Sequence, residues 1–353
     1  MKALSIIGSV FLSIIFSVLM GGGIATAAAL PAIPCMIGAG VISIIPTGLT
    51  GGVSMATVYK EVWTGQVISA LSTAEKGTFL DGIADYSQHV TGVGDEACAI
   101  HLIYMGVEPD VLINNTTYPI PIQDLGEEDV VIQLDKIQTK ATPITDDELY
   151  ALSYQKIQTV KNKHASAIAK SKIAKAIHSL APGDSSKASM PVVVCTGADD
   201  GTGRKKLTWA DILTLKRKLD TLQVPVEGRR LVLCTDHLND LLEIDEKFKD
   251  QYYNSTNGTI YKRMNFEFYD YVNNPYYTVS TKVKKAYNSV PAAGDRQASV
   301  FFSMERAAKA TGWTKMYYSA ASTDPQNQRN LVNFRHYSIV LPTREEARGA
   351  IIG

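Results

Sequence analysis

The sequence predicts a mixed α+β fold, and two observations carry the prediction. Residues 145–180 contain neither Pro nor Gly, which predicts one long helix of about 54 Å at about 1.5 Å per residue. From residue 191 onward the pattern alternates in the order strand, helix, strand, helix and then strands. A chain of 353 residues is long enough to form two domains.

The composition limits the partners and the redox chemistry of the chain. Its 35 basic and 35 acidic residues cancel, so the whole chain has no net charge that favours nucleic acid or membrane. The four cysteines are scattered without a CxxC or Cys/His spacing, which indicates neither a zinc site nor a disulfide framework. We expect all four to be reduced and buried: Cys35, Cys98, Cys195 and Cys234.

Residues 1–54 are apolar and differ from the rest of the chain. No charged residue lies between Lys2 and Lys60, and residues 3–20 form an apolar run typical of a secretory signal or a membrane-spanning segment. Met55 opens an alternative start. Three interpretations of 1–54 stay open: upstream sequence mis-joined to the true start, a hydrophobic arm that is removed or buried, and a membrane anchor.

The next stretch is acidic and extended. Residues 61–75 have apolar side chains at near-helical spacing, which predicts a short amphipathic helix. Residues 77–135 then carry eleven acidic residues and neither Lys nor Arg. Two strand-like runs, 97–104 and 129–137, flank a turn-rich stretch and predict a long antiparallel hairpin or extended loop. Such a segment cannot bury itself.

The long helix has marked ends and a basic surface. Thr145 and Glu148 form a capping box at its start, and Pro182 with Gly183 stops it. Its apolar residues form two stripes, so its two halves should pack on different neighbours. After Glu148 it has no acid but six lysines, which form either a solvated face or a surface for an anionic partner. These are Lys156, Lys161, Lys163, Lys170, Lys172 and Lys175.

Turn and capping signals follow the long helix. The loop 197–206 is rich in glycine, but it lacks the Gly-x4-Gly-Lys-Ser/Thr spacing of a phosphate loop and the ligand series of a calcium loop, so it predicts turns. Thr208 caps a helix that runs to Leu222. Residues 229–234 predict a buried strand, and Asp236 begins another helix.

The last third of the chain predicts mostly strands. These are residues 264–272, 276–283 and 298–304. A short helix is expected at 305–311, with Gly312 as its C-terminal stop. A polar connector, 322–330, leads to the last strand, 331–341, and to a short tail, 342–353.

No stretch of the sequence predicts an active site. The six histidines show neither HExxH nor another metal-ligand spacing. Cys234 and His237 come closest to a nucleophile with a base, but a Cys at the end of a buried strand, followed by a helix-capping Asp, explains them with less. We predict no catalytic residue, no cofactor and no metal. A cytosolic enzyme built on residues 191–330 remains an alternative.

Several short stretches occur in an informative order. They are Met55–Trp63, Asp85–Val90, Pro119–Asp124, Gln133–Asp135, Pro143–Asp146 ahead of the long helix, Leu219–Arg229, Leu241–Leu242 and Phe301–Ala307. In this order the chain resembles the major capsid proteins of tailed bacteriophages with the Hong Kong 97-like fold. The resemblance covers residues 55–353 and rests on order and spacing, with no single diagnostic motif.

The resemblance implies a division of the chain. The expected Hong Kong 97-like capsid fold has an N-terminal arm, an extended β-hairpin loop, a peripheral domain with a long spine helix, and an axial domain. In this chain the arm would be 55–92, the extended loop 93–140, the peripheral domain 141–181 with 326–353, and the axial domain 182–325. Residues 1–54, an apolar leader or a mis-joined upstream segment, depart from the family pattern.

The resemblance also implies a function. The chain would self-assemble into an icosahedral phage head that encloses double-stranded DNA, as part of the virion, after assembly in the host bacterial cytoplasm. Its partners would be its own copies as pentamers and hexamers, portal and scaffolding or decoration proteins, and packaged DNA by non-specific contact, with no small-molecule substrate. An encapsulin-like compartment shell is an alternative, and so is an exported surface protein if the apolar N-terminus is a true signal.

Opposite charges in two segments predict contacts between subunits. Acids at the loop tip would dock near basic residues of an adjacent subunit, or else the lysines would neutralise packaged DNA. The candidate contact residues are Asp124, Glu127, Glu128, Asp129, Lys156, Lys161, Lys163 and Lys170. The loop has no Lys between Lys76 and Lys136, so we expect a shell without covalent Lys–Asn cross-links.

Overall fold

The structure is a computed structural model of the whole chain, and it describes most residues after position 54. The described ranges are 55–91, 99–105, 127–145, 154–183, 189–254, 261–323, 326–327, 329–344, 346 and 348–353. The chain divides into two compact units, 1–59 and 60–353, and the fold given below is that of the second. The expectations for residues 1–54 lie outside the described ranges. Within those ranges, no helix is both long enough and apolar enough to span a membrane.

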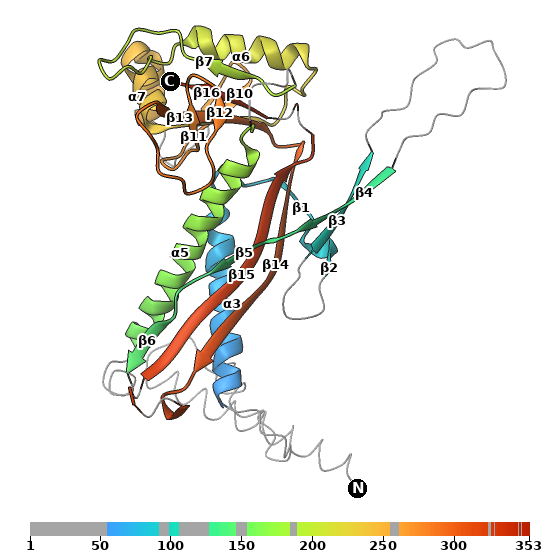
Figure 1. Cartoon of the computed structure of the whole chain (residues 1–353), viewed down its shortest axis with the longest axis vertical. Helices are drawn as coiled ribbons and strands as arrows, with labels where there is room; N and C mark the ends of the chain where they lie inside the picture. Colours follow the sequence, from blue (N-terminus) through green and yellow to red (C-terminus); the bar gives the residue numbers. More distant parts are fainter. Residues whose placement is uncertain are drawn as a thin grey trace, which may run out of the picture. The chain divides into compact units, whose positions relative to one another are not determined.

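Two long antiparallel strands, β14 and β15, form the centre of the first sheet (Figure 1). They pair from Ala307↔Pro342 to Ser319↔Leu331, with a bulge between Thr311 and Thr314. On its other edge β15 pairs with β5 and β6, and β14 pairs with the short parallel strand β1. The strands are β1 (Ala84–Asp85), β5 (Asp135–Gln138), β6 (Thr142–Thr145), β14 (Ala307–Ser319) and β15 (Arg329–Pro342).

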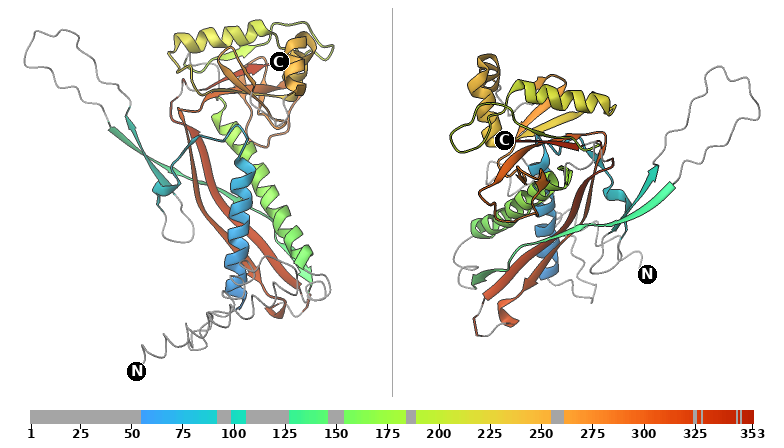
Figure 2. Two further views of the ribbon diagram at one scale, coloured as in Figure 1. Left: turned by 180° about the vertical axis from the view of Figure 1, so that it is seen from behind. Right: turned by 45° about the horizontal axis from the view of Figure 1, so that its top comes forward.

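Helices α3 (Met55–Glu75) and α5 (Tyr154–Leu180) lie against this sheet (Figure 2). Apolar side chains of both helices form one core with the sheet: Val67, Leu71, Ile144, Ala165, Ile168, Ala169, Met316, Val332 and Phe334. The C-terminal turns of α5 enter a different core, to which they contribute Ala176, Ile177 and Leu180. The prediction that the two halves of the long helix pack on different neighbours is therefore confirmed.

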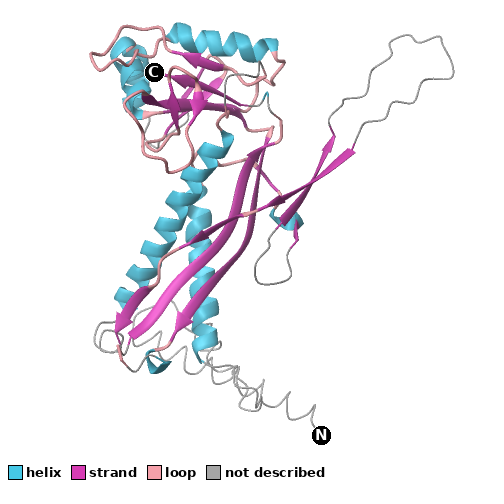
Figure 3. Cartoon of the chain, in the orientation of Figure 1, coloured by secondary structure: helices cyan, strands magenta, loops and turns pink. Residues whose placement is uncertain are grey.

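The acidic segment forms the predicted antiparallel hairpin (Figure 3). β3 (Ala99–Met105) pairs with β4 (Glu127–Gln133) along its whole length, and β2 (Val90–Thr91), which follows the 3₁₀ turn η1 (Ser87–His89), pairs with β3. The hairpin loop, 106–126, lies outside the described residues. Only one residue separates β4 from β5, so the hairpin continues directly into the first sheet.

Strands from the second half of the chain form an eight-stranded sheet. Its order is β12-β11-β13-β8-β10-β9, and β16 pairs with both β13 and β7. The strands are β7 (Val192–Val194), β8 (Arg229–Leu233), β9 (Tyr261–Arg263), β10 (Phe266–Asp270), β11 (Tyr276–Thr278), β12 (Val283–Lys284), β13 (Asp295–Ser303) and β16 (Arg348–Ile352). β8 is buried along its whole length, as predicted from the sequence.

The eight-stranded sheet has a core on each face. Successive side chains of a strand point to opposite faces. Accordingly Val300 and Phe302 of β13 enter one core with the end of α5, whereas Phe301 enters the other with the helices α6, α7 and α8. A strand that is apolar at every position is expected where both faces are covered.

The helices of this domain begin close to the predicted positions. Thr208 and Asp211 form a capping box at the start of α6 (Trp209–Thr221). The next helix, α7 (Thr235–Ile244), begins one residue before Asp236, with Cys234 as its N-cap. It is followed by α8 (Glu246–Asn254), and a 3₁₀ turn, η2 (Ala321–Thr323), follows β14.

The prediction of a short helix at 305–311 is wrong. Residues 307–311 belong to β14 instead, where Ala307 and Ala308 pair with Pro342 and Leu341. The run of Ala and Lys favours a helix locally, but ladder hydrogen bonds and burial of Ala307, Ala308 and Ala310 against the sheet override that preference.

The start of the long helix and the division into domains stay predictions. Thr145 ends β6, where it pairs with Arg329, and the described part of the long helix begins at Tyr154. Residues 146–153, which include the acids of the expected capping box, lie outside the described residues. In the described sheets, 307–319 pairs with β15, and the tail strand 348–352 joins the eight-stranded sheet.

Candidate functional site

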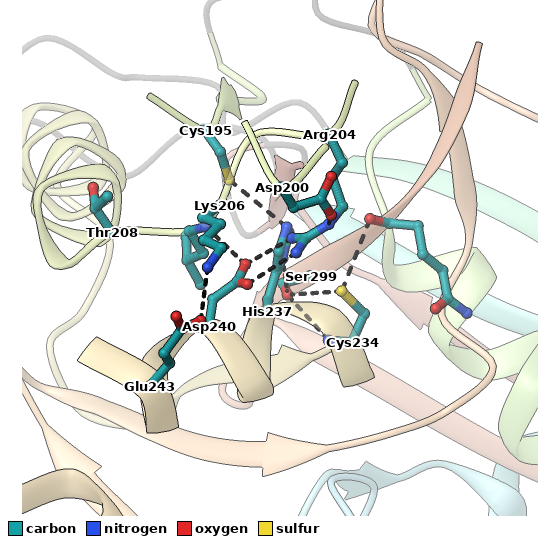
Figure 4. A network of polar contacts seen from close by, with 12 residues as sticks. Cys195, Asp200, Arg204, Lys206, Thr208, Cys234, His237, Asp240, Glu243 and Ser299 are labelled. Atoms are coloured by element: carbon teal, nitrogen blue, oxygen red, sulfur yellow. Dashed lines mark hydrogen bonds and ion pairs between the residues drawn. The ribbon is translucent and has the colours of Figure 1, made fainter. Parts of the chain in front are cut away.

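A buried polar network lies beneath the start of α7 in the eight-stranded sheet domain (Figure 4). The imidazole of His237 contacts Cys195 Sγ through Nε2 at 3.7 Å and Ser299 Oγ through Nδ1 at 2.7 Å. The Ser299 hydroxyl accepts a hydrogen bond from the Cys234 backbone N–H at 3.1 Å and donates to Cys234 Sγ at 3.8 Å. All four residues are fully or almost fully buried.

Burial sets the protonation state of this network. It raises the pKa of the Cys234 thiol to about 11 and raises that of Cys195 further, and it lowers the pKa of His237 to about 4. Near neutral pH the thiols are protonated and the imidazole is neutral, so no thiolate–imidazolium pair forms. The geometry supports a structural role for Cys234 and His237. Cys195 and Cys234 are free and buried, as expected, whereas Cys35 and Cys98 lie outside the described residues.

A mostly buried ion pair between Arg204 and Asp240 lies next to the network (Figure 4). Arg204 makes a bidentate contact with Asp240, with Nη–Oδ distances of 2.7 and 2.9 Å, and its Nε donates to Asp200 at 2.8 Å. Asp240 also accepts the backbone N–H of Leu207 at 2.9 Å. The pair is mostly buried, so removal of one partner would leave an uncompensated charge.

The glycine-rich loop 197–206 is closed by the antiparallel bridge Asp199↔Lys205 and is held by the side-chain-to-backbone hydrogen bonds expected of turn chemistry. The Asp199 carboxylate accepts the backbone N–H groups of Gly201 and Gly203, and Asp200 accepts both the N–H and the hydroxyl of Thr202. Hydrogen bonds from Thr202 hold the pKa of Asp200 well below its usual range. The loop's carboxylates are thus occupied by the loop itself. Among the described residues, no group of three or more His, Cys, Asp or Glu could hold a metal ion.

Replacing His237 tests the network through the pH dependence of stability. Between pH 6.5 and pH 4 the unfolded chain binds a proton at this imidazole and the folded chain does not, so acidification destabilises the fold. From pH 7 to pH 5 this residue should account for a loss of about 2 kcal/mol, which His237→Asn should remove.

The measurement is urea unfolding of wild type and His237→Asn at both pH values. Other histidines of lowered pKa contribute equally to both proteins, so the difference between the two pH slopes isolates His237. Identical slopes would contradict a neutral, buried imidazole.

The acidic contact residues predicted from the sequence are only partly within the described structure. Glu127, Glu128 and Asp129 are the first three residues of β4, and they pair with Met105, Tyr104 and Ile103. Asp124 lies outside the described residues, and so do the side chains of the other three.

The predicted basic contact residues differ from one another in burial. Lys161 is 4% exposed: its ammonium donates to Gln66 and lies 5.2 Å from the ring centre of Trp63, both on α3. Because the ammonium of Lys161 is engaged within its own chain, we do not propose it as a contact residue. Lys163 and Lys170 are exposed, and the side chain of Lys156 lies outside the described residues.

Sequence reasoning missed the role of Lys172. Its buried ammonium pairs with Glu75 at the end of α3 and donates to Thr311 Oγ1 of β14 at 3.2 Å. Glu75 also receives Lys309, at 3.6 Å. In the sequence Lys172 is one of six similar lysines, and only its position relative to α3 and β14 distinguishes it.

Comparison with known proteins shows a likeness in structure. No family model matches the sequence, and no curated protein matches it either. Among solved structures, the capsid of Ralstonia phage GP4 matches with a TM-score of 0.50 and 10% identity, over 78% of this chain and 87% of that one. The chain has the Hong Kong 97-like fold.

Two further solved structures also match. The capsid of a native GTA particle matches this Hong Kong 97-like chain with a TM-score of 0.50 and 11% identity, over 75% of this chain and 88% of that one. A virus-like particle from Pyrococcus furiosus matches with a TM-score of 0.47 and 11% identity, over 83% and 99%.

Proposed function

We propose that this chain is the major capsid protein of a phage-like icosahedral head, which self-assembles and encloses double-stranded DNA. The observation that carries the proposal is the shared fold, which extends over 87% of the Ralstonia phage GP4 capsid chain. A fold alone does not determine a function, so features of this chain itself must agree with it.

The hairpin β3–β4 is such a feature. At its base, Ile100 and Leu134 are buried against Ala310 and Tyr337 of the first sheet. Towards its loop, the described ladder continues from Leu102↔Val130 to Met105↔Glu127, where β3 pairs with β4 and with no other described strand. A two-stranded hairpin is marginal by itself, and contact with a neighbouring subunit would stabilise it.

The parts of the chain receive roles by the same proposal. Helix α3 would be the N-terminal arm, β3–β4 the extended loop, α5 with the sheet of β14 and β15 the peripheral domain, and the eight-stranded sheet with α6–α8 the axial domain. The partners would be copies of the chain in pentamers and hexamers, portal and scaffolding or decoration proteins, and packaged DNA by non-specific contact. Assembly would take place in the cytoplasm of a bacterial host.

Electron microscopy of the purified protein tests the proposal. We expect closed icosahedral particles. N-terminal sequencing of the protein in these particles also distinguishes the three interpretations of residues 1–54. Denaturing electrophoresis should show monomer, because residues 77–135 contain no Lys for a covalent cross-link. A protein that stays monomeric over a broad range of concentration and salt would contradict the proposal.

An encapsulin-like compartment shell remains the second candidate. It would form particles of similar outline, but with a cargo enzyme in place of nucleic acid. Nuclease digestion and mass spectrometry of the particle contents separate the two shells.

Charge reversal at the hairpin tests how subunits meet. We propose that Glu127 and Glu128 dock near exposed lysines of an adjacent subunit, with Lys163 and Lys170 as first candidates. Each exposed pair should contribute under about 1 kcal/mol, but repetition over a shell makes assembly salt-dependent. Glu127→Lys with Glu128→Lys should therefore impair assembly of empty particles at low salt, measured by light scattering.

Two further variants make that experiment decisive. Acidic substitutions at Lys163 and Lys170 should restore assembly of the charge-reversed protein, and Glu227→Lys, an exposed site elsewhere, serves as the matched control. Normal assembly of the charge-reversed protein at low salt would exclude the docking and favour lysines that face packaged DNA.

A further inference from the structure

The eight-stranded sheet domain has an open cleft beside the C-terminal end of α5. Its volume is about 680 Å³, and small-molecule sites typically have about 300–1,000 Å³. The cleft is lined by the end of α5, by residues 272–276 and by residues 285–291. The polar network around His237 does not line it, so the cleft is a separate feature of this domain.

The lining of the cleft is rich in amides and hydroxyls. These belong to Asn273, Asn274, Asn288, Gln297, Thr235 and Ser289. An amide side chain donates and accepts hydrogen bonds, and so does a hydroxyl. The lining therefore suits a ligand that carries donors and acceptors close together.

Asn274 supplies a hydrogen-bond acceptor that no described residue uses. The residue is 2% exposed, and its Nδ2 donates to the Val232 carbonyl at 3.3 Å. Its Oδ1 is buried as well and accepts no hydrogen bond from the described part of the chain. A buried acceptor without a donor is destabilising and calls for an explanation. Because Asn274 lines the cleft, a ligand that donates an O–H or N–H there would supply the missing partner.

Two partly exposed tyrosines, Tyr276 and Tyr287, add aromatic surface to the cleft. The ring of Tyr287 packs edge-on against His178, with ring centres 5.5 Å apart, and its centre lies 5.2 Å from the Lys175 ammonium. His178 is fixed in turn, since its Nε2 donates to the Lys285 carbonyl at 2.9 Å. The face of an aromatic ring is electron-rich and attracts the C–H groups of a sugar ring, whose hydroxyls can bind amides at the same time.

The lining has little net charge. Among the described residues that line the cleft none is an acid, and the one lysine, Lys285, forms an ion pair with Asp295 at 3.1 Å. Burial lowers the pKa of His178, so its imidazole is neutral near pH 7. A charged ligand would lose water there without gaining a counter-charge, so the cleft favours a neutral one.

We propose that the cleft binds a neutral N-acetylated sugar, whose amide N–H donates to Asn274 Oδ1 and whose ring packs against Tyr276 or Tyr287. The exposed apolar rim, Val272 and Val290, would contact the acetyl methyl group. This inference goes beyond the proposed function, because it concerns the single subunit and holds whether or not the chain forms a shell.

Titration of the full chain with chitotriose tests the site, measured by saturation-transfer NMR and calorimetry. We expect saturable binding whose affinity barely changes between low and high salt, because the lining is close to neutral. Tyr287→Ala and Asn274→Leu should each weaken binding about tenfold or more, and maltotriose, which lacks the acetamido group, should bind wild type about tenfold more weakly. Tyr252→Ala removes a 38% exposed tyrosine of α8 in the same domain and, as the matched control, should bind like wild type.

Circular dichroism and urea unfolding establish that each variant is folded before binding is compared. Absence of saturable binding to wild type would overturn the proposal, and so would binding that Tyr287→Ala and Asn274→Leu leave unchanged, because the sugar would then bind elsewhere. Equal affinity for maltotriose or for glucose phosphate would overturn the assignment of a neutral N-acetylated ligand. Competition by glycerol at the same concentration would indicate an adventitious additive only and would also count against the site. None of these outcomes bears on the shell, which electron microscopy tests separately.

Discussion

The buried ammonium of Lys172 joins the three elements on which the first sheet and its helices depend. It sits on α5, pairs with Glu75 at the end of α3 and donates to Thr311 on β14. The side chain of Lys172 is 6% exposed and that of Glu75 16%. Loss of Glu75 would leave the Lys172 ammonium away from water without a counter-charge, at a cost of about 3–5 kcal/mol, whereas loss of Lys172 leaves Glu75 paired with Lys309. The bulge between Thr311 and Thr314 lies at the same junction.

This junction explains how a helix rich in lysine is held inside a fold. The lysines of α5 point in two directions. Lys161 and Lys172 point inward to partners on α3 and β14, whereas Lys163 and Lys170 are exposed. Cationic groups that are paired within the chain hold α5 to its neighbouring elements, whereas Lys163 and Lys170 face solvent.

Local signals predicted the elements that local chemistry determines. The Thr208–Asp211 capping box and the buried strand β8 fall where the sequence places them, and the order of elements was enough to predict the fold. Elements that depend on distant pairing were not predictable: residues 305–311 resemble a helix until β15 pairs with them, and the tail strand β16 is recognisable only between β7 and β13. Burial of Lys172 could not be predicted either, because the sequence does not show which of the six lysines faces the interior of the fold.

A double-mutant cycle on Glu75 and Lys172 tests the central claim most directly. Denaturant unfolding of wild type, Glu75→Gln, Lys172→Met and the double variant, all kept monomeric, gives the coupling free energy between the two side chains. The account predicts a coupling above about 2 kcal/mol, with the double variant more stable than the sum of the two single losses implies. A coupling below about 0.5 kcal/mol would show that the junction does not hold α3, α5 and β14 together.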